Sequence, residues 1–464
     1  MPPLVWRWTL PLVLVVLLPT WPHVTGASPL ETYGYGSRAI SMGGAYSAVS
    51  DDFAAAFYNP AGLPQIGDVD LGFGMTFFNT SFNTIQNVVV GETPGGEPII
   101  GDVDTSLSDN GGFMGGVSVG LSEDIALGVG IYLPSTAYLA RLQTQNQREP
   151  NFIWYEKRPK RFALLVSVGA RVYKGLHLGA GLDVLFGPQG VVNVRVPVGS
   201  EGTVDLALTF RPRIAPYAGL LYKTKNNMSF AIVYKDKKNQ GEVDINLNAN
   251  IEYPLLAIPI AGKMESMIFY SPRQVIFGWA WKPGERFNLS FDLAWLQWSQ
   301  FKDATLSMAV AIGPGGGTQV NFQELLDPGF NDTLLPRAGI EYLAKKWSLF
   351  PLADRVELKL RGGYYFQKSP VPEQTALMNF LDSDTHVFST GLGLALRDLF
   401  GTTRALKLDL HFQFHQLMNR EHRKAGEFAD LDGDGIPDTR VIGYPGYATG
   451  GNIFAGGFTL GTSF

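Results

Sequence analysis

Several acidic residues near the carboxyl end of the sequence are spaced as in a calcium-binding loop. Gly435 takes position 6 of that loop, where a sharp turn is needed, but position 12 is Val441, so the bidentate glutamate of an EF-hand is missing. The carboxylates would repel one another without an ion, and the alternative is an ordinary solvated Asp/Gly turn. The oxygen ligands would come from four side chains and one backbone carbonyl: Asp430, Asp432, Asp434, Asp438 and the carbonyl of Ile436.

Other residues with reactive side chains form no catalytic pattern. His411 and His415 would lie about 13 Å apart on a strand that rises ~3.3 Å per residue, too far to share a metal ion. The sequence has no HExxH, no phosphate-binding glycine loop followed by lysine, and no GxSxG elbow. We therefore expect no enzymatic activity and no organic cofactor.

Composition narrows the class of protein. Only 17% of the 464 residues are charged and 54 are glycine, which suits a β-rich chain with many turns. The absence of cysteine excludes disulfides, cysteine-ligated zinc and a catalytic thiol. A net charge of −5 gives no basic excess for nucleic acid.

The first 27 residues have the features of a secretory signal. A lone Arg7 precedes an apolar run from Trp8 to Leu18, and the small residues Thr25 and Ala27 stand where a signal peptidase would cut. The alternative is an uncleaved anchor, but the apolar run is shorter than the ~20 residues of a spanning helix. We expect cleavage after Ala27.

Later segments alternate between apolar and polar residues with a period of two. This alternation is typical of strands with two different faces. In one segment Leu406, Leu408, Leu410, Phe412 and Phe414 oppose Lys407, Asp409, His411, Gln413 and His415, and residues 287–295 and 356–366 follow the same rule.

Such strands, in an exported chain, predict a transmembrane barrel. A tilted strand of ~9–11 residues crosses the hydrocarbon layer, and only a closed barrel satisfies its backbone hydrogen bonds there. Trp295 and Trp298 suit an aromatic girdle near one strand end. The soluble alternative is a large β-sandwich or propeller.

The pattern predicts fourteen antiparallel strands within residues 67–464. Short connections such as 122–124 and 282–286 alternate with long ones such as 83–111 and 416–450. Short turns and both termini would face the periplasm, and the calcium loop would face outside. The strands are expected near 68–82, 112–121, 125–134, 160–173, 176–196, 203–222, 228–249, 266–281, 287–308, 336–344, 355–367, 385–397, 404–415 and 451–464.

The final residues carry a further signal. Phe464 ends a strand with alternating faces, and this resembles the recognition signal of bacterial outer-membrane barrels. The resemblance implies assembly by the barrel assembly machinery, contact with outer-membrane lipids, and, in our expectation, a monomer.

Residues 28–66 do not alternate and are rich in Ala, Gly and Ser. A segment this short does not fold alone. It is either a periplasmic linker or a plug inside the barrel, where small residues would allow close packing.

This segment, "GSRAISMGGAYSAVSDDFAAAFYNPAGL", resembles the N-terminal hatch of the FadL/TodX family of outer-membrane transporters. Asn59, Pro60 and Ala61 match the family's hatch motif. Segments 293–301, 335–342 and 360–375 also resemble the family, in the expected order.

The resemblance implies a fourteen-stranded barrel plugged by a hatch, and passive uptake of long-chain fatty acids or other hydrophobic compounds. It also implies a lateral opening at a kink of the third strand. Gly128 and Gly130 would ease that bend and Pro134 would end the ladder pairing, although both glycines could equally pack in the lumen.

Two features of the sequence leave alternatives open. Lys359, Arg361 and Lys407 either pair with nearby carboxylates or contact a substrate carboxylate. The aromatic segments at 131–142 and 151–162 would form a ligand-capture surface, a lipid girdle or a loop core. The competing functions are a barrel relative with a secretion or adhesin role, and a general porin.

Overall fold

The computed structural model describes most of the chain after residue 31. The predicted signal at 1–27 therefore lies outside the described residues. The described residues are 32–93, 95–105, 110–134, 150–152, 162–197, 203–240, 245–253, 256–265, 269–301, 307–312, 318–322, 328–349, 353–399, 404–430 and 435–464.

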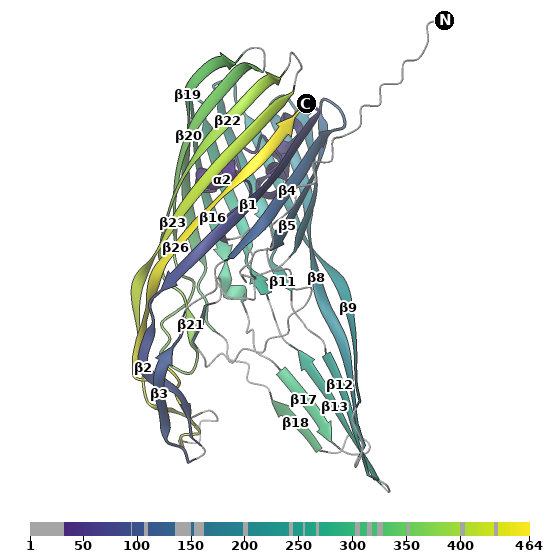
Figure 1. Ribbon diagram of the computed structural model, residues 1–464, viewed down its shortest axis with the longest axis vertical. Coiled ribbons are helices and arrows are strands. Elements are labelled where there is room, and N and C mark those ends of the chain that lie inside the picture. The colour runs from purple at the N-terminus through teal and green to yellow at the C-terminus, as the bar shows by residue number, and fades with distance from the viewer. Residues whose placement is uncertain are drawn as a thin grey trace, which may run out of the picture.

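A closed 14-strand antiparallel barrel makes up the body of the protein, which confirms the predicted fold (Figure 1). Each barrel strand pairs with the next, and the first strand closes the ring on the last from Asp70↔Ser463 to Phe82↔Gly451. The barrel strands are β1 (Val69–Phe82), β4 (Asn110–Gly120), β5 (Ile125–Pro134), β7 (Ala163–Tyr173), β8 (Leu176–Pro197), β9 (Thr203–Lys223), β10 (Met228–Lys235), β15 (Arg273–Trp281), β16 (Phe287–Gln297), β19 (Thr333–Leu349), β20 (Ala353–Gln367), β22 (Thr385–Leu399), β23 (Ala405–Arg423) and β26 (Gly446–Ser463).

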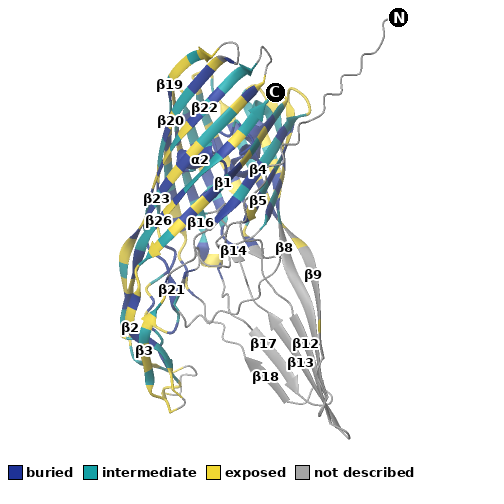
Figure 2. Ribbon diagram, in the orientation of Figure 1, coloured by how far each residue is buried: buried dark blue, intermediate teal, exposed yellow. Residues whose placement is uncertain are grey.

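Alternation of side chains along the strands gives the barrel an apolar outside and a more polar inside. On β23, Leu410 and Phe412 are 41% and 45% exposed, whereas His411 and Gln413 between them are 5% and 1% exposed. Figure 2 shows the same alternation of buried and exposed residues on the neighbouring strands. The period-two pattern therefore assigned the faces of this strand correctly.

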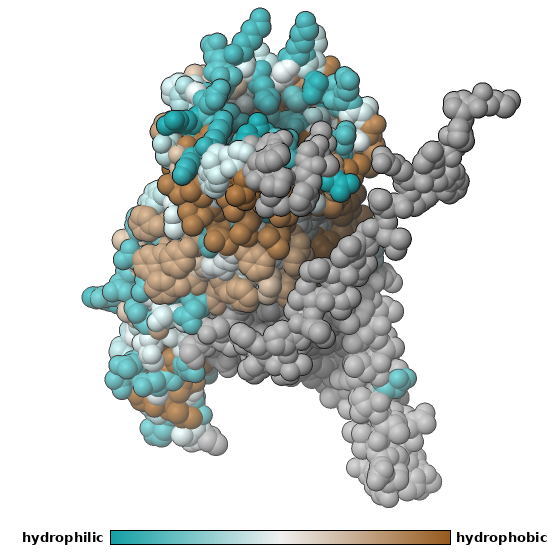
Figure 3. Space-filling view, turned by 45° about the horizontal axis from the view of Figure 1, so that its top comes forward, coloured by the Kyte–Doolittle hydropathy of each residue, from teal (hydrophilic) through white to brown (hydrophobic). Residues whose placement is uncertain are grey.

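Hydrophobic side chains gather around the middle of the barrel in Figure 3, with hydrophilic side chains above them at one end. Such a band matches the hydrocarbon layer that a transmembrane barrel must cross. Among the described residues, no helix is long and apolar enough to span a membrane.

The two ends of the barrel differ. The end that carries the turns at 121–124, 174–175 and 282–286 is called the short-turn end here, and the carboxyl terminus lies there (Figure 1). The opposite end, the long-loop end, carries the additional elements. These are β2 (Ile85–Glu92), β3 (Pro98–Val103), β6 (Asn151–Phe152), β11 (Lys238–Gln240), β12 (Ile245–Tyr253), β13 (Leu256–Glu265), β14 (Phe269–Ser271), η2 (Trp298–Gln300), β17 (Ser307–Ile312), β18 (Thr318–Phe322), β21 (Phe380–Leu381), β24 (Phe428–Ala429) and β25 (Thr439–Arg440).

The predicted ranges of three strands extend too far at the long-loop end. The strand predicted at 228–249 ends at Lys235, the one at 287–308 ends at Gln297, and the one at 266–281 begins at Arg273. The remaining residues of these three segments belong to other elements of the long-loop end. One of them is β12, which pairs in parallel with the far end of β8 and antiparallel with β13. A period-two pattern cannot distinguish a strand in the wall from a strand in an outer loop.

The prediction that Trp298 belongs to an aromatic girdle was wrong. Its side chain is buried in η2, where it packs with Tyr270 at a ring distance of 5.7 Å and with Phe330 at 6.4 Å. Phe301 stacks on Phe330 in the same cluster. The tryptophan therefore stabilises the long-loop end from within.

Residues 32–66 lie inside the barrel and are called the plug here. Their helical elements are α2 (Ser37–Ser41), α3 (Ala55–Tyr58) and the 3-10 helix η1 (Pro60–Gln65), and Figure 1 shows α2 within the ring of strands. Ala39, Ala55 and Ala61 are at most 1% exposed. Small side chains let the plug backbone approach the inner wall closely, as the composition of this segment predicts.

Candidate functional site

The Asn59-Pro60-Ala61 turn is a tight point of contact between the plug and the barrel. The Asn59 side chain accepts a hydrogen bond from the backbone N–H of Ala61 at 3.0 Å, which caps η1. Its amide group donates to the carbonyls of Ser47 at 2.9 Å and of Leu220 on β9 at 3.3 Å. This single side chain therefore joins two parts of the plug and the barrel wall.

Three glycines of the wall receive this turn. Gly169 on β7 pairs with Gly179 on β8, which pairs with Gly219 on β9, so the three form a row across adjacent strands. A Cβ on any of them would overlap Asn59 or Pro60 or their neighbours in η1. We call Gly169, Gly179 and Gly219 the glycine row.

The opposite wall holds the plug through glycines and one carboxylate. Gly339 on β19 pairs with Gly363 on β20, and a Cβ on either would overlap the plug backbone at Met42. Asp292 on β16 is 1% exposed and accepts three hydrogen bonds from the plug. The donors are the N–H of Tyr46 at 3.1 Å, the N–H of Ser47 at 3.0 Å and the hydroxyl of Ser47 at 2.7 Å.

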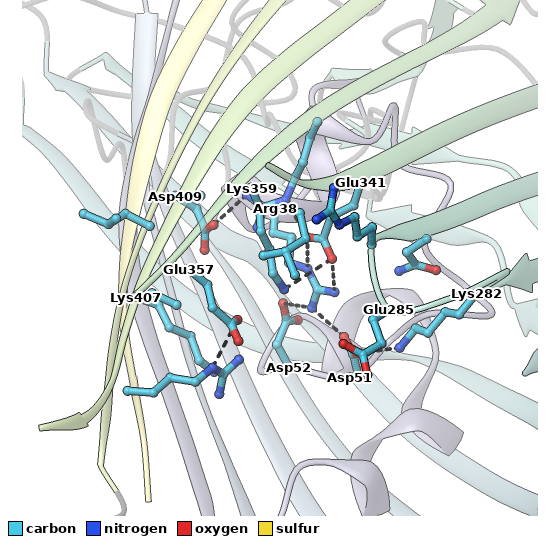
Figure 4. Close-up of a pocket in the computed structure, with 18 of the residues that line it drawn as sticks. Arg38, Asp51, Asp52, Lys282, Glu285, Glu341, Glu357, Lys359, Lys407 and Asp409 are labelled. Carbon is cyan, nitrogen blue, oxygen red and sulfur yellow. Dashed lines mark hydrogen bonds and ion pairs between the residues drawn. The ribbon is translucent and has the colours of Figure 1, made fainter. Parts of the chain in front are cut away.

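Arg38 anchors the plug to the barrel electrostatically (Figure 4). Its guanidinium makes two hydrogen bonds to Glu341 on β19, of 3.0 and 3.1 Å, and one of 2.5 Å to Asp51. Glu341 in turn accepts from Arg361 on β20 at 2.7 Å, and Arg361 also binds Asp409 on β23 at 2.6 Å. Paired and hydrogen-bonded charges of this kind are tolerated away from water, whereas removal of one partner is costly.

The other basic residues considered for a substrate carboxylate are also paired. Lys359 lies 3.5 Å from Glu341, and Lys407 donates to Asp70 at 2.5 Å. The second oxygen of Asp70 accepts from the plug N–H of Phe53 at 2.8 Å. These lysines therefore pair with carboxylates of the protein, which is the simpler of the two interpretations.

Two adjacent plug carboxylates have opposite pKa shifts. Burial raises the pKa of Asp52 to about 6, with Asp51 and Asp70 adding to the shift and Arg38 opposing it. Burial also acts on Asp51, but the neighbouring Arg38 and Lys282 outweigh it and hold the pKa of Asp51 at about 2. Asp52 accepts hydrogen bonds from the Tyr46 hydroxyl at 2.7 Å and from the N–H of Ala54 at 3.0 Å.

The plug separates spaces of different character. At the short-turn end, a cavity of ≈ 490 Å³ is lined by the charged groups around Arg38 and Glu341 (Figure 4). On the other side of the plug, a chamber of only ≈ 40 Å³ has mixed walls, in which aromatic and aliphatic side chains stand beside polar ones that include Lys235, Asp292 and Arg337. The apolar and aromatic lining of this chamber, which we call the aromatic chamber, is Tyr33, Phe57, Tyr58, Ile276, Leu335 and Tyr365.

The kink expected in the third strand is absent from the described residues. β5 pairs without a register shift to β4 up to Pro134 and to β7 up to Tyr132, so no gap opens there. A Cβ on Gly128 would meet Leu63 of the plug at 2.8 Å, and one on Gly130 would meet the Tyr35 hydroxyl at 2.9 Å. These glycines make room for the plug, which was the alternative interpretation.

The two histidines of β23 face the plug. His411 Nδ1 lies 2.9 Å from the hydroxyl of Ser37, which also lies 2.8 Å from the hydroxyl of Thr459 on β26. His415 packs against Tyr33 at a ring distance of 5.2 Å. Both histidines therefore line the lumen and contact the plug.

The proposed calcium loop lies at the long-loop end between β24 and β25. Asp430 accepts a hydrogen bond from the N–H of Gly435 at 2.7 Å, and Gly435 has a positive φ of 86°. Ile436 is exposed, and the N–H of Asp438 donates to the carbonyl of Ala429 at 2.9 Å. Asp432 and Asp434 lie outside the described residues, within which no group of three His, Asp or Glu side chains is placed to hold a metal.

Most of the predicted capture surface also lies outside the described residues, at 135–142 and 153–161. Phe152 is described and is buried, where it stacks on Phe82 at 4.2 Å. This residue therefore belongs to a loop core.

Sequence reasoning missed Asp292 and the glycine row. Asp292 is one polar residue of the alternating segment 287–295, and nothing local marks it as a partner of the plug backbone. The glycine row had a usable signal: Gly169, Gly179 and Gly219 each stand on the inward face of a strand, but their alignment depends on the register between strands.

The fold and the site together define a transmembrane β-barrel whose lumen holds a docked plug. Residues 208–430 match the model of the outer membrane protein transport protein family (OMPP1/FadL/TodX). The resemblance to the FadL/TodX family is therefore confirmed, and this is a family of transporters.

Individual relatives agree with this assignment. The chain is 22% identical to alkane uptake protein A of Marinobacter nauticus over 461 residues, which cover 92% of this chain and 90% of the relative. Its fold is similar to that of a Pseudomonas aeruginosa FadL homologue, with a TM-score of 0.54, 14% identity, and coverage of 96% and 98%. The toluene transporter TodX of P. putida gives a TM-score of 0.51, 15% identity, and coverage of 93% and 99%.

We predict that Gly179→Ala loosens the plug. The added methyl group would overlap the backbone of Pro60 and Ala61, and such overpacking costs about 1–3 kcal/mol. Limited proteolysis of the detergent-solubilised protein should cut the plug faster. Gly362→Ala is the matched control, because its Cβ would meet nothing closer than 3.6 Å. Equal cleavage of the two variants would contradict the docking role of the glycine row.

We predict that the plug docks more tightly at pH 5 than at pH 8. The pKa of Asp52 is raised to about 6 from 3.8, so its contribution is complete below pH 3.8 and is lost as the pH rises through 6. The full effect would be about 3 kcal/mol. Hydrogen exchange in residues 32–66, corrected for intrinsic rates, measures it.

Asp52→Asn should flatten this pH dependence. Asp51→Asn should weaken docking throughout pH 5 to 8, because the low pKa of Asp51 keeps that carboxylate ionised over the whole range. A pH dependence unchanged by Asp52→Asn would rule out Asp52 as the titrating group.

Proposed function

We propose that this protein is an outer-membrane channel for the passive uptake of hydrophobic small molecules. The observation that carries the proposal is a closed barrel whose lumen is blocked by a docked plug, with the aromatic chamber on the side of the long loops. A plugged lumen argues against a general porin. The aromatic and aliphatic side chains of the chamber offer apolar surface to a ligand, and the polar groups beside them would fix its orientation.

The ligand class comes from the wall chemistry and from the relatives. Tyr33 and Tyr365 in the chamber offer flat apolar surfaces, and the hydroxyl of Tyr365 is already used, because it donates to the carbonyl of Thr32 at 3.0 Å. The relatives include an alkane uptake protein and a toluene transporter. Alkanes, aromatic hydrocarbons and long-chain fatty acids are therefore the substrates proposed for this chain, which has no proposed enzymatic role.

The route runs from the long-loop end to the short-turn end. In this proposal the short-turn end and both termini face the periplasm, because short turns usually lie there. The monomer takes the ligand from the outer medium through the loops into the chamber. Because that chamber is only ≈ 40 Å³, a ligand can advance only when the plug shifts from its docked position.

A reversible lock of the plug tests this function. The hydroxyl oxygens of Ser37 in α2 and Thr459 in β26 are 2.8 Å apart, and the chain has no native cysteine. A Ser37→Cys/Thr459→Cys variant can therefore form one disulfide between plug and wall. In a strain lacking the native gene, we expect the oxidised variant to take up labelled hexadecane or toluene at least tenfold more slowly than the reduced variant.

Each single cysteine variant is the control, since both should transport equally with and without reductant. Normal hydrocarbon uptake in the deletion strain would contradict transport and favour a secretion or adhesin role. A large steady conductance of the oxidised variant in planar bilayers would instead indicate a general porin.

We also propose that residues 430–438 bind Ca²⁺ at the outer end of the channel. The acidic spacing supports this, as do the turn at Gly435 and the two-residue ladder that joins Phe428–Ala429 to Thr439–Arg440. Arg440 places its guanidinium 4.4 Å from the Phe428 ring centre and ties this hairpin to Glu92 of β2. An ion here would therefore order two neighbouring hairpins.

Chelation should lower the melting temperature of the purified protein. Binding to the folded state alone contributes about 2.7 kcal/mol at a calcium concentration 100-fold above Kd. Asp432→Ala should abolish the shift between EGTA and millimolar Ca²⁺, and Asp102→Ala on β3 is a control outside the loop. A shift that survives Asp432→Ala would remove this proposal.

A further inference from the structure

A second cavity at the short-turn end has a different construction from the charged cavity of Figure 4. It measures ≈ 770 Å³ and lies between the end of the plug, the turn that joins β4 to β5, and the ends of β7, β8 and β9. Pro64 and Gln65 of η1 line it, just after the Asn59-Pro60-Ala61 turn. A ligand that passes the plug on the side of the glycine row would reach this cavity.

Three nitrogen-bearing side chains line its wall on adjacent strands. Arg171 on β7 pairs directly with His177 on β8, and His177 pairs with Leu221 on β9, two residues before Lys223. Arg171, His177 and Lys223 all line the cavity. On the same inward faces, Arg171 and His177 lie two residues from Gly169 and Gly179 toward the short-turn end, and Lys223 lies four residues from Gly219. We call Arg171, His177 and Lys223 the basic row.

The basic row retains unused capacity to bind an anion. His177 is 4% exposed and its Nδ1 has no hydrogen-bond partner among the described residues. Lys223 donates to the neutral amide of Gln65 at 2.6 Å, and no carboxylate of the described chain lies within ion-pair distance of it. Arg171 lies 3.5 Å from Asp124, in a pair whose side chains are 42% and 61% exposed.

The basic row differs from the basic residues of the charged cavity in Figure 4, where Arg361 and Lys407 are each bound by a carboxylate at 2.5 to 2.6 Å. Two acidic residues, Asp68 and Glu123, also line the second cavity, but both are exposed. Arg171 and Lys223 are exposed as well, so water screens charges of both signs at this wall, and His177 is the buried member of the basic row.

The outer rim beside this cavity is apolar. Leu121, Val172 and Tyr173 are 61%, 51% and 72% exposed at the same end of the barrel. An anionic group held by the basic row would therefore have an apolar surface nearby for an attached chain. This arrangement fits an amphiphile better than a small free anion.

We propose that the basic row binds the carboxylate headgroup of a fatty acid as it leaves the channel. The proposal rests on the proposed uptake function. It adds that the channel distinguishes fatty acids from alkanes, since an alkane has no group for Arg171 and Lys223 to bind. Charge-assisted hydrogen bonds to a carboxylate are among the stronger polar contacts in proteins.

Binding of paired ligands to the purified full-length barrel tests this site. Oleate and 1-octadecene have the same chain length and differ in the carboxylate. Arg171→Gln/Lys223→Gln should bind oleate about tenfold more weakly, as expected for loss of charged hydrogen bonds, and 1-octadecene unchanged. Lys174→Gln/Lys225→Gln removes two exposed lysines of neighbouring turns outside the cavity and should bind both ligands as the native protein does.

Unchanged oleate binding by the basic-row variant would contradict the proposed carboxylate site. Equal losses of affinity for both ligands would also contradict it, because they would indicate a general structural defect. If the variant lost co-purified phospholipid but kept oleate, the headgroup would be a phosphate and the carboxylate assignment would be wrong. Uptake of hexadecane by the native protein tests the proposed channel separately, because that ligand does not use the basic row.

Discussion

Every backbone N–H and C=O group that crosses a membrane needs a partner within the protein, and the pairing of β1 with β26 completes that requirement. All other features depend on this closure. Because the ring of strands is closed, it has an inside, and because side chains alternate along each strand, the inside can be polar while the outside remains apolar. His411 and Phe412 on β23 show that a single residue step changes the environment from lumen to lipid.

A closed ring of this size leaves a lumen that the plug fills, and the plug is held by two different kinds of contact. The glycine row admits the Asn59-Pro60-Ala61 turn because it has no side chains in the way, so this contact depends on shape. Arg38, Glu341 and Arg361 hold the other side through charged hydrogen bonds, so that contact depends on ionisation and hydration. Shape contacts need close packing, whereas charged contacts can be exchanged for water when the plug moves.

The cavities on the two sides of the plug differ in the polarity of their walls. The aromatic chamber on the long-loop side combines aromatic and aliphatic surface with polar groups, while the cavities at the short-turn end offer mainly charged and polar walls. In the proposed uptake route, this difference would favour release of a hydrocarbon at the short-turn end. A molecule with an anionic headgroup would find available cations at the short-turn end. Arg171 and Lys223 have no carboxylate as close to them as Asp409 is to Arg361.

The alternation of residues such as Leu410 and His411 was enough to predict the barrel, the number of its strands and the inward side chains, because a membrane imposes period two on every spanning strand. Small residues and Asn59-Pro60-Ala61 likewise indicated the plug. The sequence could not align Gly169 with Gly179 and Gly219, assign Asp292 to the plug backbone, or show that β5 pairs without a gap. These features depend on the register between strands and on which wall each part of the plug meets, and both are decided only when segments far apart in the chain come together.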